Sequence, residues 1–166
     1  MAKTRYMFLS ALATVTTVLT AAVLATPPSG QLSSATLARG MFADPVDIKF
    51  KIMVGNQDVI HVPDAHDTVV VNTVYAPGGN TGWHSHPGPT IVLVKTGTLT
   101  LYSADDPTCS GRTYSAGQAF VDPGQGHVHI GVNHSSVNTE LWAVFLDVPP
   151  GMSPRIDAPA PGNCLF

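Results

Sequence analysis

Two histidine-containing stretches decide the fold of this chain, GGNTGWHSH at residues 78–86 and GQAFVDPGQGHVHIGVN at residues 117–133. Each stretch contains two histidines separated by one residue: His84 and His86, then His127 and His129. Residues two apart in an extended strand project from the same face, so each pair can place both imidazoles in one cavity. Neutral imidazole is the commonest protein ligand for transition metals. The pattern therefore predicts one metal site built from two strands.

The residues around these stretches predict short β-strands and no helix of useful length. Runs rich in β-branched and aromatic residues are separated by Gly, Pro, Asn and Ser, as in antiparallel sheets. The expected strands are 46–54, 58–62, 67–75, 90–95, 98–103, 112–114, 118–121, 127–132 and 138–146. Closely spaced strands of this kind are typical of an all-β sandwich or barrel.

The first stretch resembles the first sequence motif of the cupin superfamily. That motif reads glycine, five residues, His-x-His, three or four residues, glutamate, six residues, glycine. Gly78, His84, His86 and Gly97 match it, whereas the glutamate position is occupied by Thr90.

The second stretch resembles the second cupin motif, which reads glycine, five residues, Pro-x-Gly, two residues, histidine, three residues, asparagine. The matching residues are Gly117, Pro123, Gly126, His129 and Asn133, with one extra residue between the proline and the second glycine. The resemblance covers about residues 67–146. Within the superfamily, this part of the chain resembles small single-domain cupins of type 2. It implies a single jelly-roll β-barrel, and it does not specify an activity.

The resemblance also implies a metal near the centre of the barrel, held by His84, His86 and His129. Because Thr90 is a poor ligand, the site either has three histidines and open positions or takes His127 as a fourth ligand. Thr90 and Asn133 are expected beside the ligands, as hydrogen-bonding groups that fix a histidine tautomer. A barrel that binds no metal is the alternative. His61, His66 and His134 lie in expected loops and are interpreted as surface residues.

A nitrogen-rich, uncharged ligand set suits Fe, Zn, Cu, Ni or Mn better than Mg or Ca. It also leaves the full charge of a divalent ion in the site, which favours an anionic ligand. The leading hypothesis is an oxidoreductase of dioxygenase type that acts on a small organic molecule, with Glu140, Tyr75 and Tyr102 as the few candidate bases. The alternative is a non-catalytic module that binds a small ligand or a sugar, for which Trp83 and Trp142 are the candidate stacking surfaces.

The N-terminal residues predict export from the cytoplasm. Residues 1–25 contain a short basic segment, a long uncharged segment and a small-residue cleavage site at 23–25, as in a Sec-type signal peptide. An uncleaved membrane anchor is the alternative. The expected organisation continues with a flexible leader at 26–44, the barrel domain at 45–150 and a Pro-rich tail at 151–166.

Export also bears on the two cysteines, Cys109 and Cys164, which are the only ones in the chain. In an oxidising compartment they are expected to form a disulfide that ties the tail to the domain. The formal net charge of −3 and the absence of basic clusters argue against nucleic acid as a partner. No membrane association is expected after cleavage of the signal peptide. Several expected strands are apolar on both faces, so a homodimer is a further hypothesis.

Overall fold

The computed structural model describes residues 24–53 and 59–164, and every regular element in these two ranges is a β-strand. The strands are β1 (Ser29–Gly40), β2 (Ile48–Lys51), β3 (Val59–Val62), β4 (Asp67–Asn80), β5 (His84–Ser85), β6 (Thr90–Thr96), β7 (Thr98–Ser103), β8 (Arg112–Ser115), β9 (Ala119–Asp122), β10 (His129–Val132), β11 (Thr139–Val148) and β12 (Ile156–Asp157). The all-β prediction is confirmed: of the nine expected strands, 98–103 coincides with β7 and the other eight differ from the observed strands only at their ends, whereas β1, β5 and β12 were not expected.

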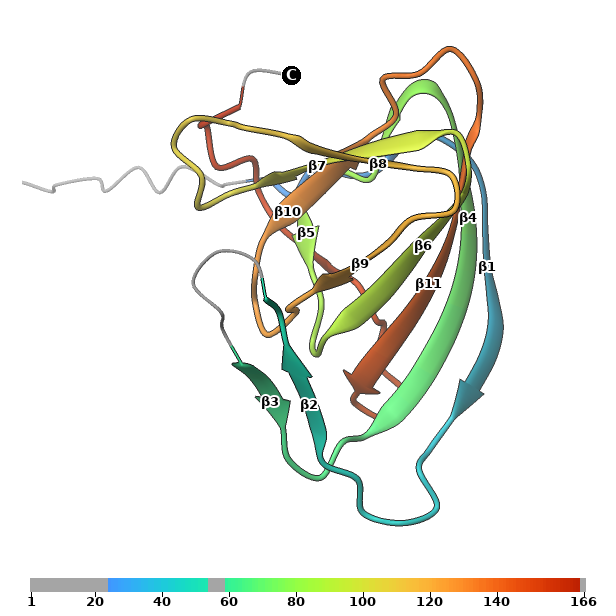
Figure 1. Ribbon diagram of the computed structural model, residues 1–166, viewed down its shortest axis with the longest axis vertical. Coiled ribbons are helices and arrows are strands. Elements are labelled where there is room, and N and C mark those ends of the chain that lie inside the picture. The colour runs from blue at the N-terminus through green and yellow to red at the C-terminus, as the bar shows by residue number, and fades with distance from the viewer. Residues whose placement is uncertain (1–23, 54–58, 165–166) are drawn as a thin grey trace, which may run out of the picture.

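All the strands except β2 and β3 form one antiparallel sheet that curls into a nearly closed barrel (Figure 1). Along the sheet the order is β12-β5-β10-β4-β11-β6-β9, with β7 beside β10 and β8 beside β7. Neighbours in this sheet are mostly far apart in sequence, which is the jelly-roll pattern expected from the cupin resemblance. β2 and β3 form a separate two-stranded sheet.

Alternation along the long strands determines which side chains fill the barrel. In β4, the buried residues Val69, Val71 and Tyr75 alternate with more exposed neighbours, and β11 repeats the pattern with Leu141 and Phe145. The two strands pair directly, with Phe145 opposite Val69 and Thr139 opposite Tyr75. Their inward faces therefore supply a continuous apolar wall, and burial of such side chains is the main driving force for folding.

The expected flexible leader at 26–44 is wrong for most of its length. Residues 29–40 form β1, which pairs with β4 over nearly its full length, although all twelve residues are exposed. β1 is held mainly by backbone hydrogen bonds to the edge of β4, and Arg39 secures its end by donating to Asp67 at 2.6 Å. A strand that buries no apolar face lacks the hydrophobic alternation by which strands are predicted.

The domain also extends past the expected boundary at residue 150. β12 pairs with β5, and Ala158 and Cys164 are buried beside Trp83, Ile130 and Val132. The expected disulfide is present between Cys109 and Cys164, with their Cα atoms 5.4 Å apart. The tail is thus part of one end of the barrel.

The segment just after the expected cleavage site also contacts this end of the barrel. Thr26 donates its backbone N–H to Ala158, and its hydroxyl accepts a hydrogen bond from the Trp83 N–H at 2.7 Å. The expected signal peptide at 1–25 lies almost wholly outside the described residues. In the described part of the chain, no helix has the length and hydropathy needed to cross a membrane.

Candidate metal centre

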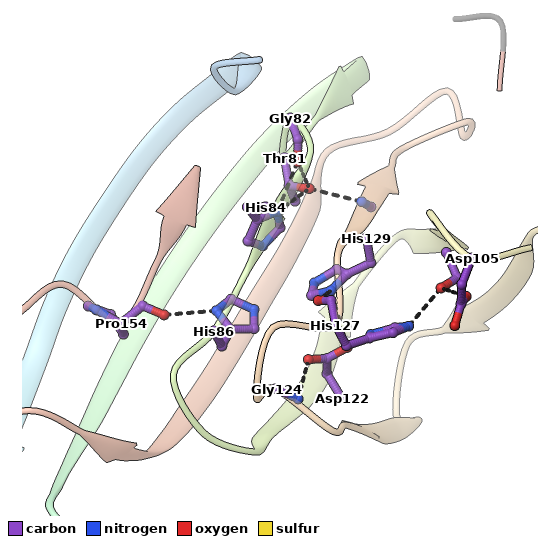
Figure 2. Close-up of polar contacts among 12 residues, drawn as sticks. Thr81, Gly82, His84, His86, Asp105, Asp122, Gly124, His127, His129 and Pro154 are labelled. Atoms are coloured by element: carbon purple, nitrogen blue, oxygen red, sulfur yellow. Dashed lines mark hydrogen bonds and ion pairs between the residues drawn. The ribbon is translucent and has the colours of Figure 1, made fainter. Parts of the chain in front are cut away.

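Three of the four motif histidines come from two adjacent strands and the turn that follows one of them. His84 on β5 and His129 on β10 are directly opposite each other in the sheet. His86 follows β5 and projects toward the same interior point (Figure 2). The structure therefore brings together the three histidines that the motifs single out.

The three imidazoles are packed closely and are buried. Ring centroids lie 4.8 Å apart for His84 and His86, 4.4 Å for His84 and His129, and 5.1 Å for His86 and His129. One nitrogen from each ring lies within 4.8 Å of the other two. The exposed fraction of each residue is 6% or less.

The Nδ1 atom of every ring in this group contacts a backbone carbonyl oxygen, and that of His129 also lies beside a carboxylate. His84 Nδ1 donates to the carbonyl oxygen of Gly82 at 2.8 Å, and His86 Nδ1 donates to the carbonyl oxygen of Pro154 at 2.8 Å. His129 Nδ1 donates to the carbonyl oxygen of His127 at 3.3 Å, and it also lies 3.2 Å from Oδ2 of Asp122. Each ring is thereby fixed in the tautomer that leaves its Nε2 lone pair available, which is how metal-binding histidines are usually oriented.

Both motifs therefore supply histidines to one point inside a jelly-roll barrel, which is the fold of cupin proteins. No protein-family model matches the chain, and no curated protein matches it either. The likeness to cupins thus consists of the fold and of the position of the motif histidines.

Several solved structures share part of the cupin barrel. The polyketide cyclase RemF from Streptomyces resistomycificus is 21% identical with a TM-score of 0.45, and the match covers 55% of this chain and 60% of that one. An oxalate oxidase is 25% identical with a TM-score of 0.42, over 48% of this chain and 41% of that one. A cupin domain from Bordetella pertussis tohama i is 20% identical with a TM-score of 0.42, over 63% and 94%. This chain thus spans about 60% or less of the cyclase and the oxidase.

Burial keeps the three imidazoles of the site uncharged. Burial, followed by the proximity of His129 and His86, lowers the pKa of His84 well below its ordinary value of 6.5. Burial and the neighbouring His129 lower the pKa of His86 to about 4. Burial also lowers the pKa of His129, although Asp122 opposes the effect. Neutral imidazoles with free Nε2 atoms fit a divalent transition metal, which binds only the deprotonated ring.

His127, the alternative fourth ligand, is not one of the three clustered histidines, but it forms a second potential metal-binding group with Asp122 and His129, whose ligand atoms also lie within 4.8 Å of one another. β10 begins only at His129, and the backbone before it turns through positive φ at Gly124, Gln125 and Gly126 (62°, 51° and 89°). His127 is therefore outside the strand, and the alternation rule does not place it beside His129.

The two ring nitrogens of His127 contact groups outside the three-histidine site. Nδ1 lies 2.9 Å from Oδ2 of Asp122, and Nε2 lies 2.7 Å from the Ser103 hydroxyl. The hydrogen bond with Asp122 raises the pKa of His127, despite partial burial. His127 thus supports the carboxylate that holds His129.

Asp122 is the functional residue that the sequence did not reveal. Its side chain is 1% exposed, and it contacts His127 and His129 through Oδ2 and accepts the Gly124 N–H through Oδ1 at 2.9 Å. Burial would raise the pKa of Asp122, but the His127 hydrogen bond and the nearby histidines outweigh burial and lower it. In the sequence, Asp122 precedes Pro123 and Gly124, a combination typical of a turn. No local signal distinguishes it from a turn residue.

Thr90 and Asn133, the two residues expected to hydrogen-bond beside the histidines, lie in different surroundings. Thr90 is fully buried and lines the same cavity as the histidines, but its Oγ1 has no hydrogen-bond partner among the described residues. Asn133 is also fully buried, yet its amide donates to the carbonyl oxygens of Tyr75, Ala76 and Val137. The interpretation of Asn133 as a partner of a metal-binding histidine is therefore wrong, because it stabilises the turns at the end of the barrel.

The histidines line a cavity of about 280 Å³ inside the barrel. Its wall is largely apolar and includes Val92, Leu99, Leu101, Phe120, Leu141 and Phe145. The polar residues of the lining are the three histidines, Gln31, Ser34, Thr36, Thr73, Tyr75, Thr81, Thr90, Ser153 and Arg155. A cavity of this size and lining suits a small organic ligand.

The other candidate residues do not reach this cavity, except Tyr75. Glu140 contacts Lys95 at 3.0 Å and Trp142 on the outer surface, so it is not a base for the site. Tyr102 bonds to His134 at 2.9 Å. Tyr75 lines the cavity, and burial raises the pKa of its hydroxyl.

Proposed function

We propose that this protein is an exported, metal-dependent oxidoreductase of dioxygenase type that acts on a small organic substrate. The observation that carries the proposal is the convergence of three buried, neutral imidazoles at an apolar cavity, each with its Nδ1 already hydrogen-bonded. Residues His84, His86 and His129 would hold the ion. A bound transition metal would supply Lewis-acid and redox chemistry at that point.

The chain's own residues prepare the site in two ways. The hydrogen bonds from Nδ1 to the carbonyl oxygens of Gly82, Pro154 and His127 fix the rings before a metal or substrate binds, so little reorganisation is needed. The apolar side chains of the wall lower the polarity around the site, which strengthens electrostatic interactions there. Three protein ligands, rather than four or more, leave coordination positions for a small molecule.

The alternative function, a sugar-binding module without catalysis, has less support from the cavity. Trp83 is only 2% exposed and packs in the core, whereas Trp142 lies on the outer surface beside Lys95. Neither indole can stack on a ligand inside the barrel. Sugars also require many hydrogen-bond partners, and the apolar wall offers few. A binding module for a small apolar ligand is the form of the alternative that the cavity fits.

The proposal is tested by metal content and by oxygen consumption. The full chain is reconstituted with Fe(II), Zn, Mn, Ni or Cu, dialysed, and analysed for bound metal. It is then offered small phenolic or thiol acids in an oxygen electrode. We expect one ion per chain, oxygen uptake with at least one metal, and loss of both in His86→Gln. His134→Gln, which removes an exposed imidazole, is the matched control. Ligand-induced stabilisation without oxygen uptake would favour the binding module, and absence of bound metal would refute the metal site.

Export is supported by the disulfide, which is typical of proteins in oxidising compartments. We propose cleavage after Ala25, so that the mature chain begins at Thr26. N-terminal sequencing of protein recovered outside the cytoplasm tests this directly. A mature chain that starts at residue 1 would instead indicate an uncleaved anchor or no export.

A further inference from the structure

The C-terminal tail adds a guanidinium group to the cavity of the three-histidine site. Arg155 lies just before β12 and lines the same cavity as His84, His86 and His129. Its Nε donates to Asp157 at 2.6 Å, but its Nη2 is buried and has no hydrogen-bond partner among the described residues. A buried N–H donor without a partner is costly, and this cost is larger for a charged group.

The segment that carries Arg155 is fixed in place by the site itself. Pro154 accepts the hydrogen bond from His86, and the Arg155 backbone N–H donates to the Ser153 hydroxyl at 3.1 Å. Directly after Arg155, Ile156 and Asp157 pair with Ser85 and His84 of β5. The same few residues therefore position both a histidine of the site and the guanidinium.

The charge of Arg155 is only partly balanced. Its ion-pair partner Asp157 is half exposed, with 53% of its side chain accessible, so solvent weakens the pairing. The positive charge of Arg155 also contributes to the lowered pKa values of His84, His86 and His129, after burial and the neighbouring histidines. Arg155 is thus the one cationic side chain among the described residues that line the cavity, and the buried carboxylate of Asp122 acts on His86 and His129 with the opposite sign.

The remaining surface of the cavity is apolar, apart from the Thr90 hydroxyl and a few other polar groups. The Thr90 Oγ1 is the second buried polar atom of this cavity that has no hydrogen-bond partner in the described chain. A ligand that satisfies the Arg155 Nη2 needs an acceptor oxygen and an apolar remainder. A carboxylate supplies such oxygens, and a guanidinium binds carboxylates well because its planar N–H groups match their geometry.

The geometry points to Arg155 as the residue that binds the carboxylate of a small monocarboxylic acid, whose apolar body lies against Leu99, Phe120 and Leu141. This inference rests on the proposed function for the position of the substrate beside a metal, but the binding itself does not require the metal. It predicts preference for an acid with a ring or a branched chain over a short dicarboxylic acid.

The first test compares benzoate with benzamide and benzyl alcohol, which are neutral and of similar shape. Binding to the metal-free full chain is measured by calorimetry or by thermal stabilisation. We expect benzoate to bind at least about tenfold more tightly than either neutral compound, because a hydrogen bond to a charged group adds about one to two decades of affinity. Equal binding of the three compounds would overturn the inference, and this comparison needs no variant. Oxalate binding more tightly than benzoate would also overturn it.

The second test uses Arg155→Gln and Arg155→Lys, with the exposed Arg112→Gln as a matched control. Arg155→Gln should lower benzoate affinity about ten- to a hundredfold and leave benzamide binding unchanged, whereas Arg155→Lys should retain part of the preference. Unchanged benzoate affinity in Arg155→Gln would refute the role of Arg155. If benzoate binds through Arg155 but no metal binds, the proposed function fails and this inference stands. If metal binds but benzoate affinity is unchanged in Arg155→Gln, the proposed function stands and this inference fails.

Discussion

Acidification should destabilise the metal-free protein through His86, and the size of the effect follows from the structure. Burial lowers the pKa of this imidazole in the folded state to about 4, whereas an unfolded histidine titrates near 6.5. Between about pH 6.5 and about pH 4, His86 is protonated in the unfolded chain and neutral in the folded chain. Stability is therefore constant above pH 6.5 and falls as the pH drops toward 4.

The two pKa values give the magnitude. Between about pH 7.5 and about pH 4.5, preferential proton binding by His86 in the unfolded state lowers the free energy of unfolding by about 2.5 kcal/mol. His84 and His129 have lowered pKa values as well and add losses of the same sign. Asp122, whose pKa is also lowered, loses its contribution only as the pH falls through its own folded value. The total pH dependence therefore includes several groups, and His86 must be isolated by difference.

The assay is chemical denaturation of the metal-free protein at about pH 7.5 and about pH 4.5, for the wild type and for His86→Gln. Glutamine does not titrate, and its amide can still donate to the Pro154 carbonyl oxygen. The wild type should lose about 2 to 3 kcal/mol more than the variant over this interval. Parallel pH dependence of the two proteins, within about 0.5 kcal/mol, would refute the interpretation of His86 as a buried neutral ligand.

Three further outcomes are expected. Asp122→Asn should weaken metal binding about ten- to a hundredfold in competition with a chelator, because His127 loses its charged hydrogen-bond partner and His129 loses the neighbouring negative charge. Unchanged affinity would show that the Asp122 contacts do not affect metal binding. Thr90→Glu should destabilise the metal-free protein by burying a carboxylate and should raise Mn or Fe affinity, so a drop in affinity for both metals would contradict the assigned position of Thr90. Replacing Cys109 and Cys164 with alanine should lower the free energy of unfolding by about 4 kcal/mol, since the disulfide closes a loop with a sequence separation of 55. The denaturation midpoint of the reduced wild type should match that variant, and a midpoint equal to that of the oxidised protein would contradict the structural role of the disulfide.

The sequence predicted the strands that bury an apolar face and missed the strand that buries none. The central strands β4, β6 and β11 alternate or are β-branched, so their positions follow from local sequence. β1 consists of small and polar residues, with Leu32 and Leu37 at 59% and 49% exposure. Its extended shape depends on the edge of β4, which is a long-range contact that local sequence cannot show.

For the site, the same distinction applies to individual residues. His84, His86 and His129 were predictable because their spacing in two motifs carries geometric information. His127 does not lie on the same strand as His129, because β10 begins two residues later than expected, after a turn with three positive φ angles. Asp122 and Arg155 lie in a turn-like sequence and a Pro-rich tail, respectively, and only the fold brings them to the histidines.

The position of Asp122 bears on the motif position that Thr90 occupies in place of glutamate. Thr90 and Asp122 are directly opposite each other on the paired strands β6 and β9, so a carboxylate lies in the same layer of the barrel. This carboxylate lies 3.2 Å from Nδ1 of His129 instead of at the glutamate position of the motif. Its negative charge therefore lies behind the imidazole, where it orients the ring and raises its basicity. Asp122 is not part of the cavity lining, which leaves the side of the site that faces the cavity to the three histidines, Thr90 and Arg155.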